Sequence, residues 1–320
     1  MDDFSIGRLR LYPLADESLG VRSMALGVAT PDVTILLDAG VSLAPRRFGL
    51  PPHPDEFRAA REARRRILEF AEKSDIVTVS HYHLDHYTPS FTSYYEWSGR
   101  EAFERVYTGK LVLLKKPDET VSFNQRRRAR ALFKDLEEGG CRIVEADGKA
   151  MEVGSTRISA LGPYPHGGGG RMGMVLAFMI EYEDIRVVYA PDVQGPASSE
   201  VAEELLELRP TVLVIGGPPT YLAGLKIRAS VVEAGLSNLA RLARNTLLVV
   251  SHHLLRDLEW RDRLRILGVR RVNTYASLMG VEENCLEARR RELYQARPPS
   301  HEFLEWLEKY RRGIRETPPL

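Results

Sequence analysis

The sequence contains few of the residues on which several common protein classes depend. It has only two cysteines in 320 residues, and Cys141 and Cys285 lie too far apart to suggest a disulfide framework or a thiolate metal site. Its longest apolar run, residues 175–180, is far shorter than a membrane span, and its acidic N-terminus is followed by no apolar core of a signal peptide. We therefore expect a cytoplasmic protein with no membrane partner.

An excess of charge of either sign is also absent, because 44 Asp and Glu residues balance 45 Lys and Arg residues. The net charge of +1 provides no global field that would steer the protein onto nucleic acid or an anionic membrane, although it does not exclude a local basic patch. No stretch has the composition of a linker, so a single domain over residues 1–320 is expected.

Histidine is scarce as well, but three of the eight histidines stand in one motif. The motif is Ser80-His81-Tyr82-His83-Leu84-Asp85-His86, and it follows the apolar run 76–79. Histidines at positions i and i+2 of an extended segment point to the same side, so His81 and His83 can bind one metal ion. Asp85 and His86 follow where the chain turns and can bind a second. These ligand types suit a zinc-class ion, which makes a merely polar strand end the weaker interpretation.

The pattern His-x-His-x-Asp-His after a strand resembles the signature of the metallo-β-lactamase superfamily of metal-dependent hydrolases. This resemblance implies further ligands downstream, each at the end of a strand, in the order His, Asp, His. Side chains of these types follow three later apolar runs in that order: His166, Asp192 and the pair His252-His253. Taken alone, Asp192 after a proline would be interpreted as a turn residue.

The resemblance assigns the ligands to two divalent metal ions. The first ion would be bound by His81, His83 and His166, the second by Asp85, His86 and His252, and both by Asp192. A ligand set without sulfur suits Zn²⁺ and also admits Mn²⁺ or Fe²⁺. Oxygen-reducing flavo-diiron relatives usually have Glu at the position of His83, so this histidine favours hydrolysis over redox chemistry.

The two adjacent histidines leave a choice between ligands. Adjacent residues of an extended chain face opposite sides, so only one of His252 and His253 is expected to point into the site. The strand-Ser-His-x-x-x-Arg pattern, which runs to Arg256, resembles the superfamily branch that processes tRNA 3′ ends and favours His252. His253 would then be free to donate a proton or contact the substrate, and it is with Asp85 a candidate catalytic residue.

Two further features are expected beside the metal ions. Asp38 ends the run 33–37 and is either a cap or turn residue, or a carboxylate that accepts a hydrogen bond from a metal-bound imidazole; the resemblance favours the second role. The glycines after His166, Gly167, Gly168 and Gly169 among them, form either a flexible turn or a loop whose amides bind an oxyanion or phosphate. The preceding histidine favours the loop.

Three other stretches have two interpretations each. The expected helix at about 120–138 carries the densest basic patch, which is either a solvated face or a contact for nucleic acid or phosphate: Arg126, Arg127, Arg128 and Arg130. The aromatic stretch 91–97 either lines a substrate mouth or packs an insertion beside the core. His53, in the proline- and glycine-rich segment 41–54, is expected to be solvated rather than to bind metal.

The fold expected from the resemblance is an α/β sandwich of the αββα type. Two mixed β-sheets would pack face to face, with helices outside and the metal ions at one rim. A helical insertion is expected at about 91–140 and a helical C-terminal tail at about 285–320, with a short strand near 270–275 before it. The insertion and tail resemble an uncharacterised, largely archaeal branch of predicted hydrolases. The tail itself shows no residues with evident chemistry.

The function implied is a metal-dependent hydrolase in which a hydroxide bridging two metal ions attacks carbon or phosphorus. A phosphodiester, in nucleic acid or a nucleotide, is favoured as substrate by the Ser-His-x-x-x-Arg pattern and the arginine patch. An acyl hydrolase acting on a small thioester, lactone or amide is the alternative. A catalytically silent, metal-stabilised binding protein is the third hypothesis. The sequence determines neither the exact substrate nor the oligomeric state.

Overall fold

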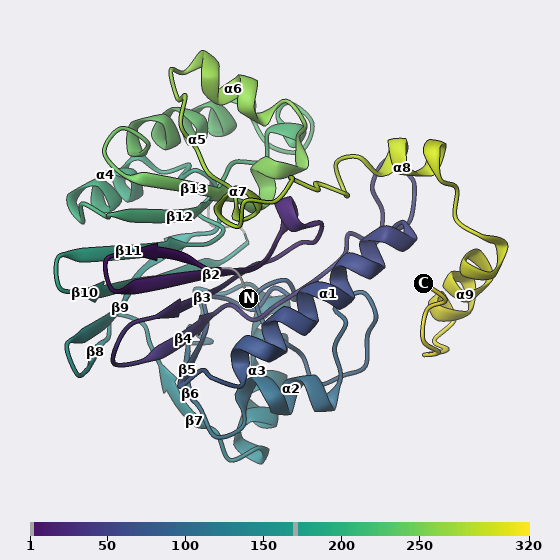
Figure 1. Cartoon of the computed structure of the whole chain (residues 1–320), viewed down its shortest axis with the longest axis horizontal. Coiled ribbons are helices and arrows are strands. Elements are labelled where there is room, and N and C mark those ends of the chain that lie inside the picture. Colours follow the sequence, from purple (N-terminus) through teal and green to yellow (C-terminus); the bar gives the residue numbers. More distant parts are fainter. Residues whose placement is uncertain (1–2, 169–171) are drawn as a thin grey trace.

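The computed structural model describes residues 3–168 and 172–320 (Figure 1). Gly169, one of the glycines predicted to bind an oxyanion, lies outside the described residues. Two β-sheets pack face to face, with α4, α5 and α6 over one outer face and α1, α2 and α3 over the other (Figure 1). The predicted αββα sandwich is confirmed.

The first sheet has seven strands in sequence order. They are β1 (Phe4–Ile6), β2 (Leu9–Asp16), β3 (Met24–Ala29), β4 (Thr34–Leu37), β5 (Ile76–Val79), β6 (Leu111–Leu114) and β7 (Arg142–Glu145). Pairing is antiparallel from β1 to β4 and parallel from β4 to β7. The sheet is therefore mixed, and the parallel strands present their carboxyl ends at one rim.

The second sheet has six strands and is mixed in the same way. They are β8 (Ala150–Val153), β9 (Thr156–Pro165), β10 (Met174–Tyr182), β11 (Ile185–Ala190), β12 (Val212–Gly216) and β13 (Leu247–Ser251). Pairing is antiparallel from β8 to β11 and parallel from β11 to β13. Its parallel strands also end at a common rim.

The helices cover the outer faces and form the C-terminal region. They are α1 (Pro54–Ala71), α2 (Arg100–Tyr107), α3 (Phe123–Glu138), α4 (Ser199–Glu207), α5 (Ala229–Leu242), α6 (Trp260–Ile266), α7 (Tyr275–Leu278), α8 (Arg290–Ala296) and α9 (His301–Arg311). Short 3₁₀ helices occur at Glu17–Leu19, Thr220–Leu222 and His252–Arg256. None of the helices in the described part of the chain is both long and apolar enough to cross a membrane.

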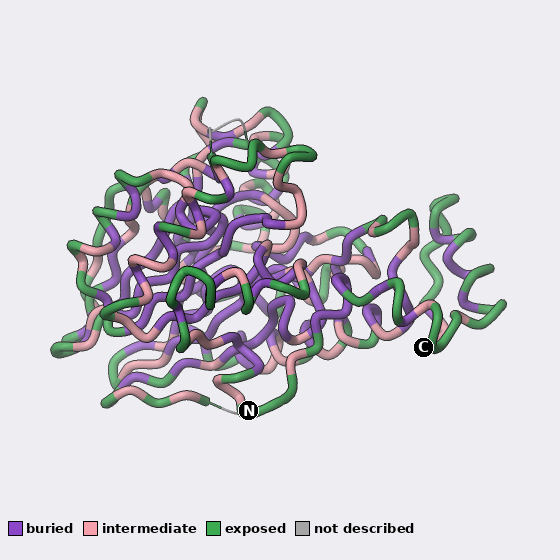
Figure 2. Tube along the Cα trace, turned by 90° about the horizontal axis from the view of Figure 1, so that it is seen from above, coloured by how far each residue is buried: buried purple, intermediate pink, exposed green. Residues whose placement is uncertain are grey.

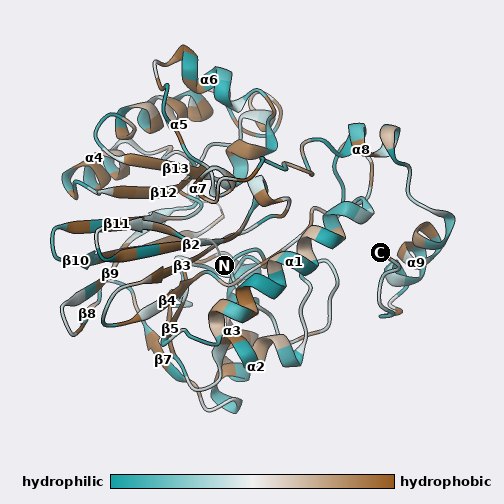
Figure 3. Ribbon diagram, in the orientation of Figure 1, coloured by the Kyte–Doolittle hydropathy of each residue, from teal (hydrophilic) through white to brown (hydrophobic). Residues whose placement is uncertain are grey.

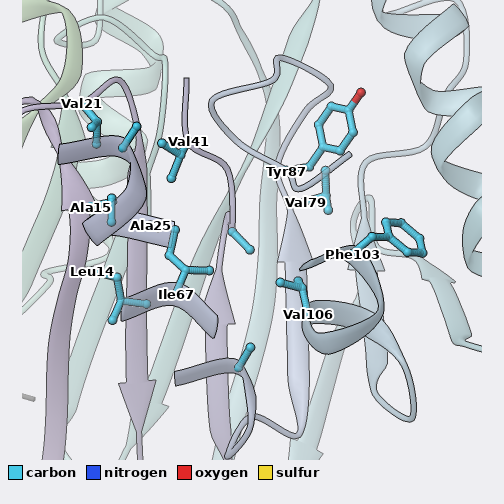
Figure 4. Packing of buried hydrophobic residues seen from close by; sticks show 14 of the residues in the cluster. Leu14, Ala15, Val21, Ala25, Val41, Ile67, Val79, Tyr87, Phe103 and Val106 are labelled. Carbon is cyan, nitrogen blue, oxygen red and sulfur yellow. The ribbon is translucent and has the colours of Figure 1, made fainter. Parts of the chain in front are cut away.

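The core has three layers because side chains alternate along each strand. In β10, Leu176 and Phe178 lie between the sheets, whereas Val175 and Ala177 face α4 and α5. Buried residues accordingly run through the centre of the molecule (Figure 2), and apolar strands lie between helices with polar outer faces (Figure 3). Figure 4 shows the third layer, in which Ile67 of α1 lies close to the first sheet.

The segment 91–140 contains α2, β6 and α3, so the expected helical insertion also supplies a strand of the first sheet. The aromatic stretch 91–97 packs onto α9: the ring centroids of Tyr95 and Tyr310 are 5.6 Å apart and those of Tyr94 and Trp306 are 6.2 Å apart. Of its two interpretations, the structure supports packing beside the core. The loop and α9 are far apart in the sequence, so local sequence could not select this contact.

Two local expectations are wrong. His53 is 3% exposed rather than solvated, because it caps α1 and its Nε2 donates to the Arg297 carbonyl at 2.7 Å. The C-terminal region covers it. Residues 270–275 form no strand; a single parallel bridge joins Asn273 to Val249, and α7 begins at Tyr275. Thr274 caps that helix through a hydrogen bond to Ser277, which ends the extended segment.

Candidate metal centre

Five strands deliver the predicted site residues to one rim of the sandwich. Asp38 follows β4, the motif 81–86 follows β5, His166 follows β9, Asp192 follows β11 and His252 follows β13. Three of these residues adopt the left-handed backbone conformation that side chains rarely occupy: φ is 49° at Asp38, 52° at Asp192 and 64° at His252. Such conformations turn the chain sharply at the strand end, and they concentrate at functional sites.

The first group of donor atoms surrounds a common point. The His83 Nδ1 atom lies 3.0 Å from His81 Nε2 and 3.2 Å from His166 Nε2. One oxygen of Asp192, Oδ2, lies 3.1 Å from the His81 nitrogen and 2.9 Å from the His166 nitrogen. Zinc–ligand bonds of about 2.1 Å in tetrahedral geometry separate ligand atoms by roughly 3.4 Å. These four donors therefore have the spacing of a metal site.

A second group lies beside the first. His252 Nε2 is 3.6 Å from Asp85 Oδ2 and 3.1 Å from Asp192 Oδ1. His86 Nε2 is 3.4 Å from Asp192 Oδ2. Asp192 thus presents one oxygen to His81 and His166 and the other to His252, and its position between the two groups is that of the predicted bridging ligand.

Partnerless buried atoms provide a test of whether these residues fit a cation. His86 Nε2 and Asp192 Oδ1 are buried, and neither has a hydrogen-bond partner among the described residues. Buried polar atoms almost always find a partner, so both atoms call for one that the described residues do not provide. A cation would supply it, and donors limited to nitrogen and oxygen suit a zinc-class ion. The residues present therefore fit the metal site that the motif predicts.

Asp38 orients the predicted ligands His81 and His86 from the side that faces away from the centre. Its carboxylate accepts hydrogen bonds from His86 Nδ1 at 2.7 Å, Tyr189 Oη at 3.1 Å and the Ser80 backbone N–H at 2.8 Å. The Ser80 hydroxyl also donates to Asp38 and lies 3.0 Å from His81 Nδ1. With their Nδ1 atoms directed outward in this way, His81 and His86 turn Nε2 toward the centre, which is the arrangement of metal-binding histidines.

The charges of the centre are strongly coupled. Burial raises the pKa of Asp192, but the nearby His252 and His166 outweigh it and hold the pKa well below its usual range. Burial lowers the pKa of His86, and the carboxylates of Asp192 and Asp38 more than reverse this effect. Burial and the neighbouring His86 lower the pKa of His81 well below its ordinary value. The centre thus holds ionised carboxylates that attract positive charge.

The two adjacent histidines do not face opposite ways, and the prediction that only one points inward is wrong. His252 Nε2 lies 3.1 Å and His253 Nε2 lies 3.3 Å from the same oxygen of Asp192. The alternation rule fails because the chain is no longer extended here: His252 has a positive φ and begins the 3₁₀ helix His252–Arg256. The two ring centroids are 4.6 Å apart.

A cleft of about 320 Å³ opens over the centre. Its lining includes five of the seven candidate ligands, the neighbouring His253 and several charged side chains: His83, Asp85, His166, Asp192, His252, His253, Arg22, Arg128, Arg256 and Glu96. Arg128, on α3, donates from Nη1 to the Tyr82 carbonyl at 3.3 Å and forms no ion pair with any described residue. A guanidinium with free donors therefore borders the candidate ligands.

The other arginines of the predicted basic patch lie outside the cleft. Arg126, Arg127 and Arg130 lie on the same helix but do not line the cleft. Only one residue of the predicted basic patch therefore reaches the centre, because successive helical residues point in different directions.

Gly167 and Gly168 line a neighbouring pocket of about 380 Å³ rather than the cleft. Gly167 has a left-handed conformation (φ 71°), and a Cβ at this position would collide with the Gln194 side chain, so the position requires glycine.

Several residues beside the centre escaped the sequence analysis. Glu17, in the first 3₁₀ helix, lies 3.1 Å from His252 Nδ1. Gln125 is fully buried and joins the motif 81–86 to Met172: it accepts from the Tyr82 N–H at 3.2 Å and donates to the Met172 carbonyl at 2.6 Å. Glu17 directly follows β2 and Gln125 lies within α3, but neither belongs to a motif. Arg256, by contrast, ends the strand-Ser-His-x-x-x-Arg pattern that the sequence shows, four residues after His252.

The comparisons with known proteins identify the family of this chain. The profile of the Beta-lactamase superfamily domain matches residues 34–218. The UPF0282 protein of Pyrobaculum islandicum is 50% identical over 296 residues, which cover 89% of this chain and 94% of that protein. The chain belongs to the archaeal UPF0282 branch of the metallo-β-lactamase superfamily.

A second UPF0282 protein, from Methanopyrus kandleri, is 44% identical over 289 residues, covering 89% of this chain and 99% of that protein. Among solved structures, the metallo-β-lactamase fold protein YhfI from Bacillus subtilis is 12% identical, with a TM-score of 0.45, over 83% of this chain and 96% of that one. The profile match contains every candidate metal ligand of the superfamily motif except His252.

Proposed function

We propose that this UPF0282 protein is a metal-dependent hydrolase that cleaves a phosphodiester. The observation that carries the proposal is the convergence of nitrogen and oxygen donors at the floor of an open cleft that arginines border. A purely structural metal site has no need of a cleft, whereas a hydrolytic site requires one for its substrate.

Two divalent metal ions are proposed as cofactors, with Zn²⁺ the best match and Mn²⁺ or Fe²⁺ also suited to the donors. The first would be held by His81, His83 and His166, the second by Asp85, His86 and His252, and both by Asp192. When bound, such ions lower the pKa of water and stabilise negative charge on a substrate oxygen.

The protein's own side chains support an anionic substrate. Arg128 has a half-buried guanidinium that borders the cleft, and phosphate accepts two parallel hydrogen bonds from such a group. His253 also lines the cleft and offers a further contact for the substrate or its leaving group. These groups would bind and orient a phosphodiester beside the metal centre.

The acyl alternative has less support. A pocket for a small thioester or lactone would need apolar walls, and the aromatic stretch 91–97 was the candidate for them. Tyr94 and Tyr95 instead pack against α9. Ten of the fifteen residues that line the cleft are charged residues or histidines. The phosphodiester remains the better match to this lining.

The test is hydrolysis of bis(p-nitrophenyl) phosphate by metal-reconstituted protein at several salt concentrations, with thioester and lactone substrates in parallel. His83→Ala serves as the control that removes one candidate ligand. Activity on the phosphodiester that is lost in His83→Ala would support the proposal. Two bound metal ions with acyl hydrolysis alone would replace it by the acyl alternative, and metal binding without turnover would favour a binding protein.

A further inference from the structure

Glu17 and Arg256 form a buried ion pair directly behind the adjacent histidines. Arg256 donates from Nε at 2.8 Å and from Nη2 at 2.6 Å to the same oxygen of Glu17, Oε1. Both residues are 3% exposed. Their elements are far apart in sequence, since Glu17 follows β2 and Arg256 ends the 3₁₀ helix that starts at His252. The pair therefore contacts both histidines from a fixed position.

Arg256 determines which nitrogen of His253 carries the proton. Its Nη1 atom lies 2.9 Å from His253 Nδ1. A guanidinium has donors and no acceptor, so Nδ1 must accept this hydrogen bond. A neutral imidazole that accepts at Nδ1 carries its hydrogen on Nε2, the nitrogen on the Asp192 side. A nitrogen that holds a hydrogen has no lone pair for a metal ion.

Glu17 imposes the opposite arrangement on His252. The Nδ1 atom of His252 lies 3.1 Å from Glu17 Oε1, and a carboxylate only accepts hydrogen bonds. His252 therefore carries its hydrogen on Nδ1 and turns the Nε2 lone pair toward Asp85 and Asp192. Arg256 Nη2 also lies 3.2 Å from His252 Nδ1, but it is closer to Glu17 Oε1, to which it donates at 2.6 Å. The reverse tautomer would set the Nδ1 lone pair against that oxygen, whereas the Nε2 lone pair faces Asp85 and Asp192, with which it would share the second metal ion.

We propose that the Glu17–Arg256 pair sets His252 and His253 in opposite tautomers, so that His252 is a metal ligand and His253 is an N–H donor into the cleft. This inference rests on the proposed function. Glu17 and Arg256 are positioning residues, since they act through the histidines. The Nε2–H group of His253 would contact an oxygen of the anionic substrate, because phosphoryl oxygens accept such hydrogen bonds.

The tautomers are measured directly by a long-range proton–nitrogen correlation spectrum of the imidazoles in nitrogen-15-labelled, zinc-loaded protein. His252→Ala and His253→Ala identify the signals. The expected spectrum shows His252 with its hydrogen on Nδ1 and a zinc-shifted Nε2, and His253 with its hydrogen on Nε2. A zinc-shifted Nε2 in His253, or a hydrogen on its Nδ1, would overturn the inference.

Zinc content provides a second readout that does not depend on activity. His252→Ala is expected to lose one of two zinc ions and His253→Ala to keep both; the reverse result would overturn the assignment. Glu17→Gln and Glu17→Ala should lower the affinity for the second zinc ion. For the alanine variant we expect an affinity lower by about 10- to 100-fold, as is typical when a partner of a metal-binding histidine is removed. An unchanged affinity in Glu17→Ala would exclude the positioning role.

Arg256→Met should allow His253 to populate both tautomers, and Arg22→Met is its matched control. Arg22 belongs to the same buried charge cluster, where it pairs with Glu287, but it contacts neither histidine. If Arg256→Met does not fold, the spectrum of the unmodified protein still decides the question. Absence of zinc from that protein would contradict the proposed function and this inference with it, whereas zinc bound with the tautomers reversed would overturn this inference alone.

Discussion

Asp38 and His86 are joined by a 2.7 Å hydrogen bond between two fully buried side chains, one at the end of β4 and the other beyond the end of β5. The bond directs His86 Nε2 toward Asp192. Asp38 and His86 follow neighbouring strands of the first sheet, whereas Asp192 follows β11 of the second sheet. The geometry of the candidate metal centre therefore depends on how the strand ends meet at the rim.

Asp38→Ala should weaken zinc binding by about 10- to 100-fold, because it removes the acceptor that orients His86. The loss of acceptors for Ser80 and Tyr189 should also lower the free energy of unfolding by about 1–3 kcal/mol. Calorimetric zinc titration and urea unfolding measure the two effects. Asp75→Ala is the control, since Asp75 is exposed and precedes β5 at the opposite end. Equal zinc affinities in the two variants would contradict the role of Asp38.

Arg128→Ala should raise the KM for bis(p-nitrophenyl) phosphate about 10- to 100-fold, because hydrogen bonds to charged groups contribute about 1.5–3 kcal/mol. Steady-state kinetics at two salt concentrations measure this change. Arg127→Ala is the matched control: it removes an exposed arginine from the adjacent position of α3, outside the cleft. If both variants raise KM equally, the whole patch rather than the cleft arginine binds the substrate.

Zinc occupancy should fall as the pH drops below about 6, because metal-binding imidazoles must be neutral and histidine has an ordinary pKa of about 6.5. The measurement is zinc content after equilibration with a chelator, with the chelator's own protonation calibrated at each pH. His83→Ala should lose zinc at a higher pH than the unmodified protein, since one candidate ligand is missing. Full occupancy at pH 5 would count against a centre built from histidines.

Glu287 should stabilise the fold in a pH-dependent way. It accepts hydrogen bonds from Arg22 at 2.6 and 2.7 Å, and it is 6% exposed. Burial raises the pKa of Glu287, but Arg22, Arg256 and Arg290 outweigh it and lower the pKa to about 2. Because the unfolded chain has a glutamate pKa of about 4.3, this stabilisation is complete above that pH and is lost as the pH falls toward 2.

Glu287→Gln should therefore lower the free energy of unfolding by about 3 kcal/mol at pH 7, because it leaves the partly buried Arg22 without its counterion. The difference from the unmodified protein should shrink between about pH 4 and pH 2. Urea unfolding across this range measures both effects. Glu292→Gln, which removes an exposed ion pair with Arg289, should cost less than about 1 kcal/mol. A similar loss in both variants would contradict the argument.

The sequence by itself determined the family, the layered fold and the residues of the candidate centre. The motif 81–86 was sufficient because its information is local: residue types and spacing at a strand end decide which side chains can reach one ion. The ligand role of Asp192 was assigned only through the family resemblance, because the local sequence of an acid after a proline predicts no more than a turn residue.

Only the tertiary structure decided which neighbours meet these residues. The turn at His252 (φ 64°) directs the side chains of both His252 and His253 into the site. The packing of α3 places Arg128, and not its three neighbouring arginines, in the lining of the cleft. The pair Glu17 and Arg256 meets across 239 residues of sequence. Such contacts depend on the relative position of separate elements, which no local pattern encodes. The sequence therefore specified the chemistry of the centre, and the packing of the two sheets and the C-terminal region set its geometry.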